Sequence, residues 1–249
     1  MRAFIARWAR QAGLAVIITL TSVTSAAATQ VVDAPSTPDE VSEADIDASN
    51  GKIKAGYGAL VSMWSADFEQ LGVRFMAPGL LRYRGAVRTS CGIMPGNNAL
   101  YCPSRNAIYF DEVFVARQAK AAARALGTDG DMVAVGIIAH EMGHAVAMQL
   151  GETSPVPYEN EATADCLAGA FTRQSKRDGT LEAGDLDEAF FGMAAAGDPT
   201  PQYTGNRRID SRISLRAALL GHGTRDQRQA NFKTGFDGGE RACLAAFRG

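Results

Sequence analysis

Histidine, cysteine and tryptophan are scarce in this 249-residue chain, which contains three, four and two of them, respectively. Basic residues are not in excess either, since 25 Lys and Arg stand against 27 Asp and Glu and the formal net charge is −2. This balance argues against a nucleic-acid partner, because such proteins neutralise phosphates with clustered basic side chains. Internal repeats and low-complexity segments are also lacking. With 46% hydrophobic residues, the chain can bury the core of one domain.

Long apolar runs are confined to the amino terminus, and no later segment is long enough to span a membrane. Residues 1–28 contain three arginines, then an apolar run over residues 14–23, then a short run of small residues. This order is typical of a secretory signal peptide. Its cleavage would leave 22 basic against 27 acidic residues in an extracytoplasmic protein, periplasmic or secreted. The alternative is an uncleaved segment that anchors the chain to a membrane.

Basic residues are absent from residues 29–50, which contain six acidic residues and two prolines. Such a charge run is usually solvated, so we expect an acidic linker here. A short prosegment that covers the site of the following domain is the alternative. The globular domain is therefore expected to occupy residues 51–249.

Apolar patterning predicts an α+β fold that is mainly helical with a small β-sheet. Apolar residues recur at helical spacing over residues 52–71, and residues 112–126 are expected to form a second helix. Two β-rich runs, at residues 73–76 and 107–110, are expected to be strands.

A further, strongly apolar helix is expected to end at about Leu150. Thr128 or Asp129 is placed to cap its amino terminus. Pro155 and Pro157 should keep the loop that follows from becoming helical.

Two of the three histidines stand four residues apart in the middle of this apolar helix. His140 and His144 therefore project from one face, one turn apart, where both imidazoles can reach a single metal ion. Glu141 follows the first of them and can act as a general base toward a water that zinc has acidified. A chance pair of histidines is the alternative. It leaves unexplained the desolvation cost of three ionisable side chains among apolar residues.

Two histidines leave zinc short of a protein ligand, because catalytic zinc sites usually take three and keep one position for water. Leu150 stands where a longer motif would have a third histidine, which excludes that subclass. Glu161 is the expected third ligand, and Glu159 is the alternative. Asp165 lies one helical turn after Glu161 and is expected to accept the free N–H of His140. An ordinary surface helix would also explain these acids, which are favourable near a helix start.

The sequence His-Glu-Met-Gly-His at residues 140–144, followed by Glu-Ala-Thr-Ala-Asp-Cys-Leu-Ala-Gly at residues 161–169, resembles the bacterial "putative neutral zinc metallopeptidase" family. Further similar motifs are Cys91-Gly92, Tyr101-Cys102-Pro103, residues 108–111, His222-Gly223-Thr224, Gln227-Arg228, Phe232, Gly235-Phe236 and Cys243. The resemblance runs from residue 51 to the carboxyl terminus. It implies a zincin-like fold, a zinc ion held with a Glu third ligand, and hydrolysis of peptide bonds. Ala147, where the family often has Gln, is a departure that bears on substrate preference.

Four cysteines in a chain with an export signal are expected to form disulfides rather than to bind zinc. Three pairings are open. The favoured one joins Cys91 to Cys102 across a loop rich in Gly and Asn, and Cys166 to Cys243, which ties the carboxyl-terminal segment to the helix of Glu161. Free buried cysteines are the alternative.

His222 and Tyr158 are candidates to hydrogen-bond the oxyanion that forms when a peptide carbonyl is attacked. Each has a plainer explanation. His222 lies next to Thr224, which can cap a following helix. Tyr158 can be a packing residue.

The sequence thus predicts a secreted zinc metalloendopeptidase with one zinc ion per chain and a peptide or protein as substrate. His140, His144 and Glu161 would hold the metal. The alternative from another class is a catalytically silent, secreted zinc-binding scaffold that binds envelope proteins or peptides, and the intact Glu141 argues against it. Membrane proteases for prenylated proteins share a His-Glu and a later Glu-to-Asp pattern, but they use transmembrane helices that this sequence lacks.

Overall fold

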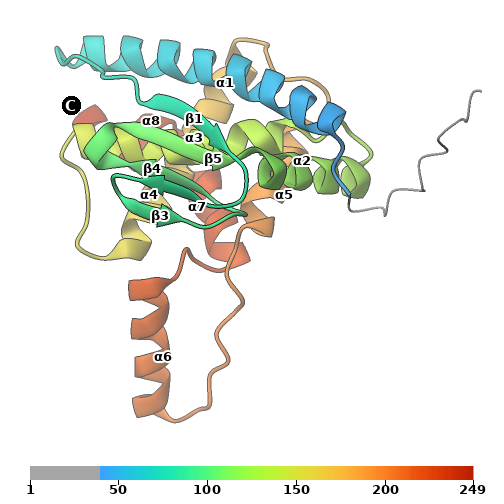
Figure 1. The fold of residues 1–249 in the computed structure, drawn as a ribbon. Coiled ribbons are helices and arrows are strands. Elements are labelled where there is room, and N and C mark those ends of the chain that lie inside the picture. Colours follow the sequence, from blue (N-terminus) through green and yellow to red (C-terminus); the bar gives the residue numbers. More distant parts are fainter. Residues whose placement is uncertain (1–39, 249) are drawn as a thin grey trace, which may run out of the picture. The chain divides into compact units, whose positions relative to one another are not determined.

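The computed structural model describes residues 40–248, so the predicted signal peptide and the first part of the predicted linker lie outside the described residues. Within them the protein is a mainly helical α+β domain, as predicted, and it has two small sheets where one was expected (Figure 1). Across residues 40–248, no helix combines the length and the hydrophobicity that a bilayer crossing needs.

Helix α1 (Glu43–Gln70) begins inside the stretch that the sequence analysis assigned to a linker. Ser42 and Asp45 form a reciprocal capping box, in which each side chain accepts the backbone N–H of the other residue. Acidic residues in the first turn also suit the positive end of the helix dipole. One face of the helix is buried, with Ile46, Ile53, Leu60, Trp64 and Phe68 at helical spacing. The acidic composition of this segment therefore belongs to a packed helix start.

The main sheet has the strand order β1-β5-β4. Its strands are β1 (Gly79–Tyr83), β4 (Ala99–Cys102) and β5 (Ala107–Asp111), and a separate antiparallel hairpin contains β2 (Val87–Thr89) and β3 (Gly92–Met94). β1 pairs parallel to β5, and β4 pairs antiparallel to it, which leaves one edge of β4 outside the ladder. The 3-10 turn η1 (Pro103–Arg105) joins β4 to β5.

The strand predicted over residues 73–76 is wrong, whereas the one over 107–110 is confirmed as β5. The backbone of Met76 is bound by side chains instead of a neighbouring strand. The amide of Gln149 bonds both its N–H, at 2.9 Å, and its carbonyl, at 3.0 Å, and Asn106 donates to the same carbonyl. Pairing begins only at Gly79, opposite Ala107.

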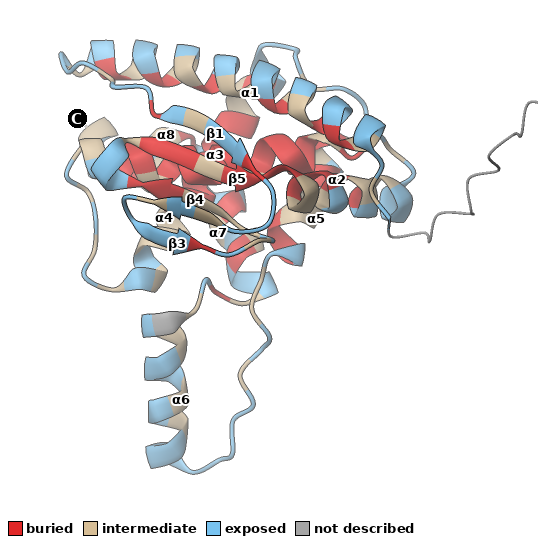
Figure 2. Ribbon diagram, in the orientation of Figure 1, coloured by how far each residue is buried: buried red, intermediate tan, exposed pale blue. Residues whose placement is uncertain are grey.

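Helix α3 (Asp131–Gln149) lies at the centre of the domain and is buried on nearly every side (Figure 2). It packs against α1, against α2 (Glu112–Leu126), which matches its predicted range, and against α4 (Pro157–Arg177) and α5 (Asp185–Ala195). The apolar run of the sequence is therefore the core of the fold.

The predicted amino-terminal cap of α3 is wrong, because neither Thr128 nor Asp129 accepts its free N–H groups. The carboxylate of Glu188, on α5, takes this role. It accepts the N–H of Gly130 at 2.9 Å and that of Met132 at 2.8 Å, and it is fully buried. A cap supplied from another helix satisfies the same orphan donors as a local one.

Helix α4 begins at Pro157, which was expected to lie in a loop; proline is well suited to the first helical position because its missing N–H is not needed there. α4 packs closely on α7 (Arg225–Gly238). A Cβ added to Gly235 would lie 1.7 Å from the carbonyl oxygen of Cys166, so the crossing requires glycine.

Two disulfides join Cys91 to Cys102 and Cys166 to Cys243, the two pairs that the sequence analysis favoured. The first ties the β2–β3 hairpin to the end of β4. The second ties α8 (Glu240–Cys243) to α4, and the 3-10 turn η2 (Ala245–Phe247) follows.

The arm, which we define as residues 199–221, contains α6 (Arg207–Leu220) and lies apart from the other helices except at one end, where it meets α4 (Figure 1). Asp198 closes its base. The Asp198 carboxylate accepts the N–H of His222 at 2.5 Å and that of Gly223 at 3.2 Å, while its own N–H donates to the Gly223 carbonyl. Thr224 then starts α7 with a capping box, as the plainer explanation of this segment predicted.

Candidate metal centre

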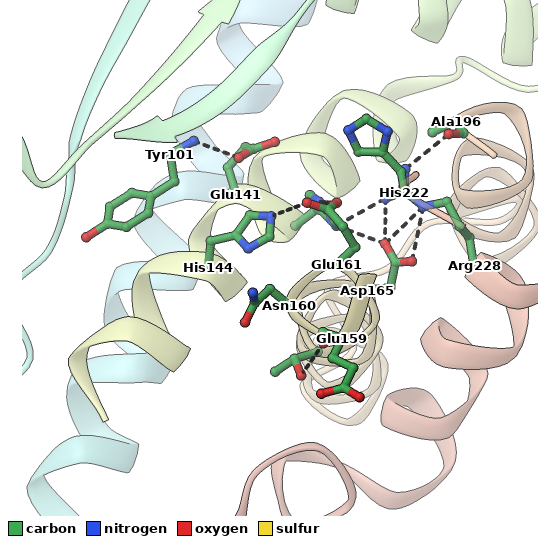
Figure 3. A network of polar contacts seen from close by, with 12 residues as sticks. Tyr101, Glu141, His144, Glu159, Asn160, Glu161, Asp165, Ala196, His222 and Arg228 are labelled. Carbon is green, nitrogen blue, oxygen red and sulfur yellow. Dashed lines mark hydrogen bonds and ion pairs between the residues drawn. The ribbon is translucent and has the colours of Figure 1, made fainter. Parts of the chain in front are cut away.

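His140 and His144 lie on α3, and Glu161 faces them from α4. Neighbouring ligand atoms of a tetrahedral zinc site lie about 3.3–3.4 Å apart when the bonds are about 2.0–2.1 Å long. Here one Glu161 oxygen is 3.1 Å from Nε2 of His140, and the other is 3.5 Å from Nε2 of His144 (Figure 3). The donor atoms of the three side chains lie within 4.8 Å of one another, close enough to share one metal ion.

Gly143 sets the distance between the two helices that carry these donors. A Cβ added at this position would lie 2.9 Å from the Cα of Ala164 and 3.0 Å from its carbonyl oxygen, both on the backbone of α4. Real side chains do not approach a backbone so closely, so α4 would have to move away. The glycine of the motif thus lets Glu161 reach the two imidazoles.

The carboxylate of Glu141 is held by the sheet. One of its oxygens accepts the backbone N–H of Tyr101 at 2.7 Å, in a contact that is buried. The backbone groups of successive residues in a strand point alternately toward and away from the neighbouring strand. The carbonyl of Asn98 accepts the N–H of Asp111, at the end of β5, so the backbone groups of Tyr101, an odd number of residues later, point away from β5. The N–H of Tyr101 is therefore available to Glu141. Glu141 is therefore oriented without being part of the His-His-Glu cluster.

His140 is oriented by a buried ion pair behind it. Its Nδ1 lies 2.8 Å from the Asp165 carboxylate, which leaves Nε2 to face Glu161. Asp165 is fully buried and also accepts two bonds from the Arg228 guanidinium, at 3.1 and 2.6 Å. The third guanidinium nitrogen donates to the carbonyl of Ala196 at 3.1 Å (Figure 3). A carboxylate so fixed holds the imidazole in one tautomer and one orientation.

The pKa values of the cluster reflect this close contact. Burial, the largest single influence, would raise the pKa of the Glu161 carboxyl, but its bond to His140 and the nearby charges of His140, His144 and His222 together outweigh burial and lower the pKa to about 2. Burial lowers the pKa of His140, but the bonds to Asp165 and Glu161 prevail and raise it to about 10. Burial also lowers the pKa of His144. The centre thus favours positive charge between Glu161 and His140, and a zinc ion would supply it.

The four charged side chains around the imidazoles also complement a divalent cation. Glu141, Glu161 and Asp165 each contribute one negative charge, and Arg228 contributes one positive charge. With both imidazoles neutral, the centre carries a net charge of −2. Zinc would cancel it.

A cavity of about 340 Å³ opens beside the centre and is lined by His140, Glu141, His144 and Glu161. The wall beyond them is mostly apolar. It is formed by α2, α3 and α5, with Phe114, Met132, Val133, Ile137 and Met193 among its residues. Asn98, Ala99 and Leu100 of the β4 segment border the same space. The centre therefore faces a cavity with a mostly apolar wall and the β4 segment at its border.

The remaining predicted residues lie in different places. His222 lines the cavity, with a side chain that is 61% exposed and whose Nδ1 lies 3.8 Å from Asp198. Tyr158 does not line the cavity; its ring lies against Gly223. Glu159, the alternative ligand, bonds to Ser154 and points away from Glu161 (Figure 3).

Two groups of the centre were missed as functional from the sequence. Arg228 was noted only as part of the family resemblance, and the backbone N–H of Tyr101 was not considered. A signal for the first existed, because Asp165 lies among apolar residues and a buried carboxylate needs a countercharge. No local pattern indicates the second.

Two imidazoles and a carboxylate beside a separate, oriented glutamate constitute the donor set of a mononuclear zinc centre. The chain belongs to the family described as "Putative neutral zinc metallopeptidase", which it matches over residues 6–247.

The chain is also similar to two relatives, both named "Uncharacterized protein YpfJ", from Escherichia coli strain K12 and Escherichia coli O6:H1. Each is 34% identical over 204 residues, which cover 74% of this chain and 66% of the relative. The match thus spans just under two thirds of the relatives' length. No solved structure matches the chain.

Proposed function

We propose that this protein is a zinc-dependent endopeptidase in which His140, His144 and Glu161 hold one zinc ion. The observation that carries the proposal is the convergence of these three donors next to Glu141, at the wall of a cavity. Family membership supports the same chemistry.

Zinc, when bound, would supply Lewis acidity that lowers the pKa of a water and polarises the peptide carbonyl. Glu141 takes the proton of the attacking water and later passes it to the leaving amine, so that the peptide bond breaks into an acid and an amine. The N–H of Tyr101 holds one Glu141 oxygen and leaves the other for this proton. Asp165 and Arg228 keep Nε2 of His140 directed at the metal position. His222, at the border of the cavity, is our candidate for contact with the carbonyl oxygen.

The free edge of β4 is the surface on which we place the substrate backbone. An extended peptide can add to such an edge through main-chain hydrogen bonds, with alternate side chains directed into pockets. Residues of β4 line the cavity, so the peptide would lie directly over the metal position. The apolar wall of the cavity then favours an apolar substrate side chain next to the cleaved bond.

The two disulfides support a location outside the cytoplasm, since such bonds persist in oxidising compartments. We therefore propose that the substrates are peptides or proteins of an extracytoplasmic compartment. Membrane anchoring by residues 1–28 remains the alternative.

Replacement of Glu141 by Gln tests the proposal against a zinc-binding scaffold without activity. Gln keeps the size of the side chain and can still accept the N–H of Tyr101, but it cannot take up the proton. We expect full zinc content and a loss of at least about a hundredfold in the rate of cleavage of a mixed peptide library. A chelator should abolish the wild-type activity, and added zinc should restore it.

Two outcomes would reject the mechanism. Wild-type protein that is fully loaded with zinc, trimmed of residues 29–39 and still without cleavage of any peptide would favour the scaffold. A Glu141→Gln variant as active as wild type would show that another group moves the proton.

A further inference from the structure

The arm carries a basic helix on a chain that is acidic elsewhere. α6 contains four arginines, one aspartate and no lysine or glutamate, a formal charge of +3, whereas the whole chain carries −2. The aspartate, Asp210, is already used, since it accepts the backbone N–H groups of Thr204 and Gly205. All four arginines are exposed, and none has an ion-pair partner within residues 40–248; they are Arg207, Arg208, Arg212 and Arg216.

Large apolar side chains are exposed on the same element. Ile209, Leu215 and Leu219 are 47%, 59% and 45% exposed, and Tyr203, in the segment that leads to α6, is 59% exposed. Residues three or four apart share a helix face, so Leu215 and Leu219 lie on the face that carries Arg208, Arg212 and Arg216. Arginines and leucines thus share one outward face, which is mostly exposed (Figure 2).

We propose that this face of the arm docks on a membrane surface that contains anionic phospholipids. Guanidinium groups bind phosphates in two-pronged hydrogen bonds, and the leucines between them can enter the boundary between headgroups and acyl chains. A second copy of the arm is the wrong occupant, because pairing would place arginines against arginines. Four basic residues and a short apolar face give reversible binding, not permanent anchoring.

The position of the arm relates this docking to the cavity. His222 follows the arm directly, Ala196 precedes its base, and both line the cavity beside the metal centre. Docking through α6 would therefore keep the entrance of the cavity near the membrane, where membrane-attached or newly exported polypeptides are found. The docking itself does not depend on the proposed peptidase activity.

Vesicle binding of the exported, zinc-loaded protein tests this inference. We expect binding to vesicles of equal parts phosphatidylglycerol and phosphatidylcholine, and much weaker binding to phosphatidylcholine alone. The double change Arg212→Glu and Arg216→Glu should lower the partition coefficient at least about twentyfold, because each basic residue near an anionic surface contributes roughly a fivefold factor. Leu215→Ser with Leu219→Ser should also weaken binding, by at least about fivefold.

The matched control reverses two exposed arginines elsewhere, Arg74 and Arg88, to Glu; the same change in net charge should leave binding within about threefold of wild type. Equal zinc content and equal circular dichroism spectra verify that the variants fold. If the Arg212→Glu, Arg216→Glu variant misfolds, the charge-neutral pair Arg212→Gln and Arg216→Gln replaces it. Wild-type protein that binds both kinds of vesicle equally, or control and arm variants that lose binding equally, would overturn the proposal. Failure to bind vesicles together with binding to an acidic protein would replace the membrane with a protein partner.

Discussion

Two clusters of side chains that could bind a metal lie along helix α3, one at its amino terminus and one beside its second half. The first contains Asp129, Asp131, Asp185 and Glu188, and the second contains His140, His144 and Glu161; in each, donor atoms lie within 4.8 Å of one another. Judged by charge alone, the first would be the better cation site.

The amino-terminal cluster is occupied by the protein itself. Both oxygens of Glu188 accept backbone N–H groups at the start of α3, Asp185 accepts the N–H of Glu182 at 2.7 Å, and the Lys52 ammonium pairs with Asp131. In the candidate metal centre, the Glu161 oxygens face imidazole nitrogens, and no backbone N–H of residues 40–248 donates to them. Proximity of acidic side chains therefore does not define a metal site. What matters is whether their oxygens are already bound by backbone N–H groups or by a basic side chain.

Removal of a proposed metal ligand should produce the largest effect. We expect Glu161→Ala to lower zinc affinity by about a thousandfold or more, since three protein ligands share a typical binding free energy of roughly 10–16 kcal/mol. Zinc titration against a competing chelator measures this loss. Glu159→Ala is the matched control and should bind as wild type. Near-stoichiometric zinc in purified Glu161→Ala would refute the ligand assignment and direct attention to Glu159.

Removal of the capping carboxylate should affect folding and not the metal. Glu188→Ala leaves two buried N–H groups of α3 without an acceptor, so we expect the free energy of unfolding to fall by about 3 kcal/mol. Glu188→Gln keeps one acceptor and should lose less. Urea denaturation of the zinc-loaded proteins gives the values, and zinc content at low temperature should stay at one ion per chain. A drop to zero zinc in a folded Glu188→Gln variant would make this cluster a second part of the metal site.

The buried pair behind His140 should give an effect of intermediate size. Asp165→Asn removes the charge that orients His140, and we expect zinc affinity to fall by about 10–100-fold. It also leaves the Arg228 guanidinium buried without a countercharge, which costs stability. Combining it with Arg228→Met should recover stability but not zinc affinity, and a double-mutant cycle separates the two. If the double variant regained normal zinc binding, Asp165 would not act through the imidazole.

The stability of the protein should depend on pH through Asp185, in the cluster at the amino terminus of α3. Burial, followed by the nearby acids Asp131 and Glu188, raises the pKa of Asp185 to about 6. Because this folded-state pKa exceeds the unfolded value, the protonated form favours folding, and that contribution is lost as the pH rises through about 6. Asp185→Asn should therefore stabilise the protein at pH 7.5 by up to about 1 kcal/mol, after allowance for solvent screening, and have little effect at pH 4. Thermal unfolding at both pH values checks this; an equal gain at both would exclude charge as the cause.

Sequence reasoning is most informative where the relevant partners are close in the chain. The helical period placed His140 and His144 on one face, and Glu161, chosen from the next helix as the expected ligand, lies beside both imidazoles in the structure. It failed where a distant partner decides the outcome. The cap Glu188 is 58 residues from Gly130, and Arg228 is 63 residues from Asp165.

The wrong strand prediction and the start of α1 before residue 51 have the same origin. Residues 73–76 have a strand-like composition, but the side chains of Gln149 and Asn106 take the backbone bonds of Met76. Residues 43–50 have a linker-like composition, but they form the start of α1, where Glu43 and Asp45 lie in the first turn of a helix with a buried apolar face. Composition states what a segment tolerates, and tertiary partners decide what it forms.

The bond from Tyr101 to Glu141 also limits which backbone groups of β4 could form hydrogen bonds with a bound polypeptide. Of the backbone groups on the free edge of this strand, the N–H of Tyr101 is taken by Glu141, whereas Ala99 lies at the cavity. For the peptide docking that we propose, an added strand could pair with the backbone of Ala99, but it could pair with the N–H of Tyr101 only by displacing the Glu141 carboxylate. The proposed general base would thus mark the end of the main-chain pairing on β4, so that the hydrogen bonds that hold the substrate would stop beside the group that takes up the proton.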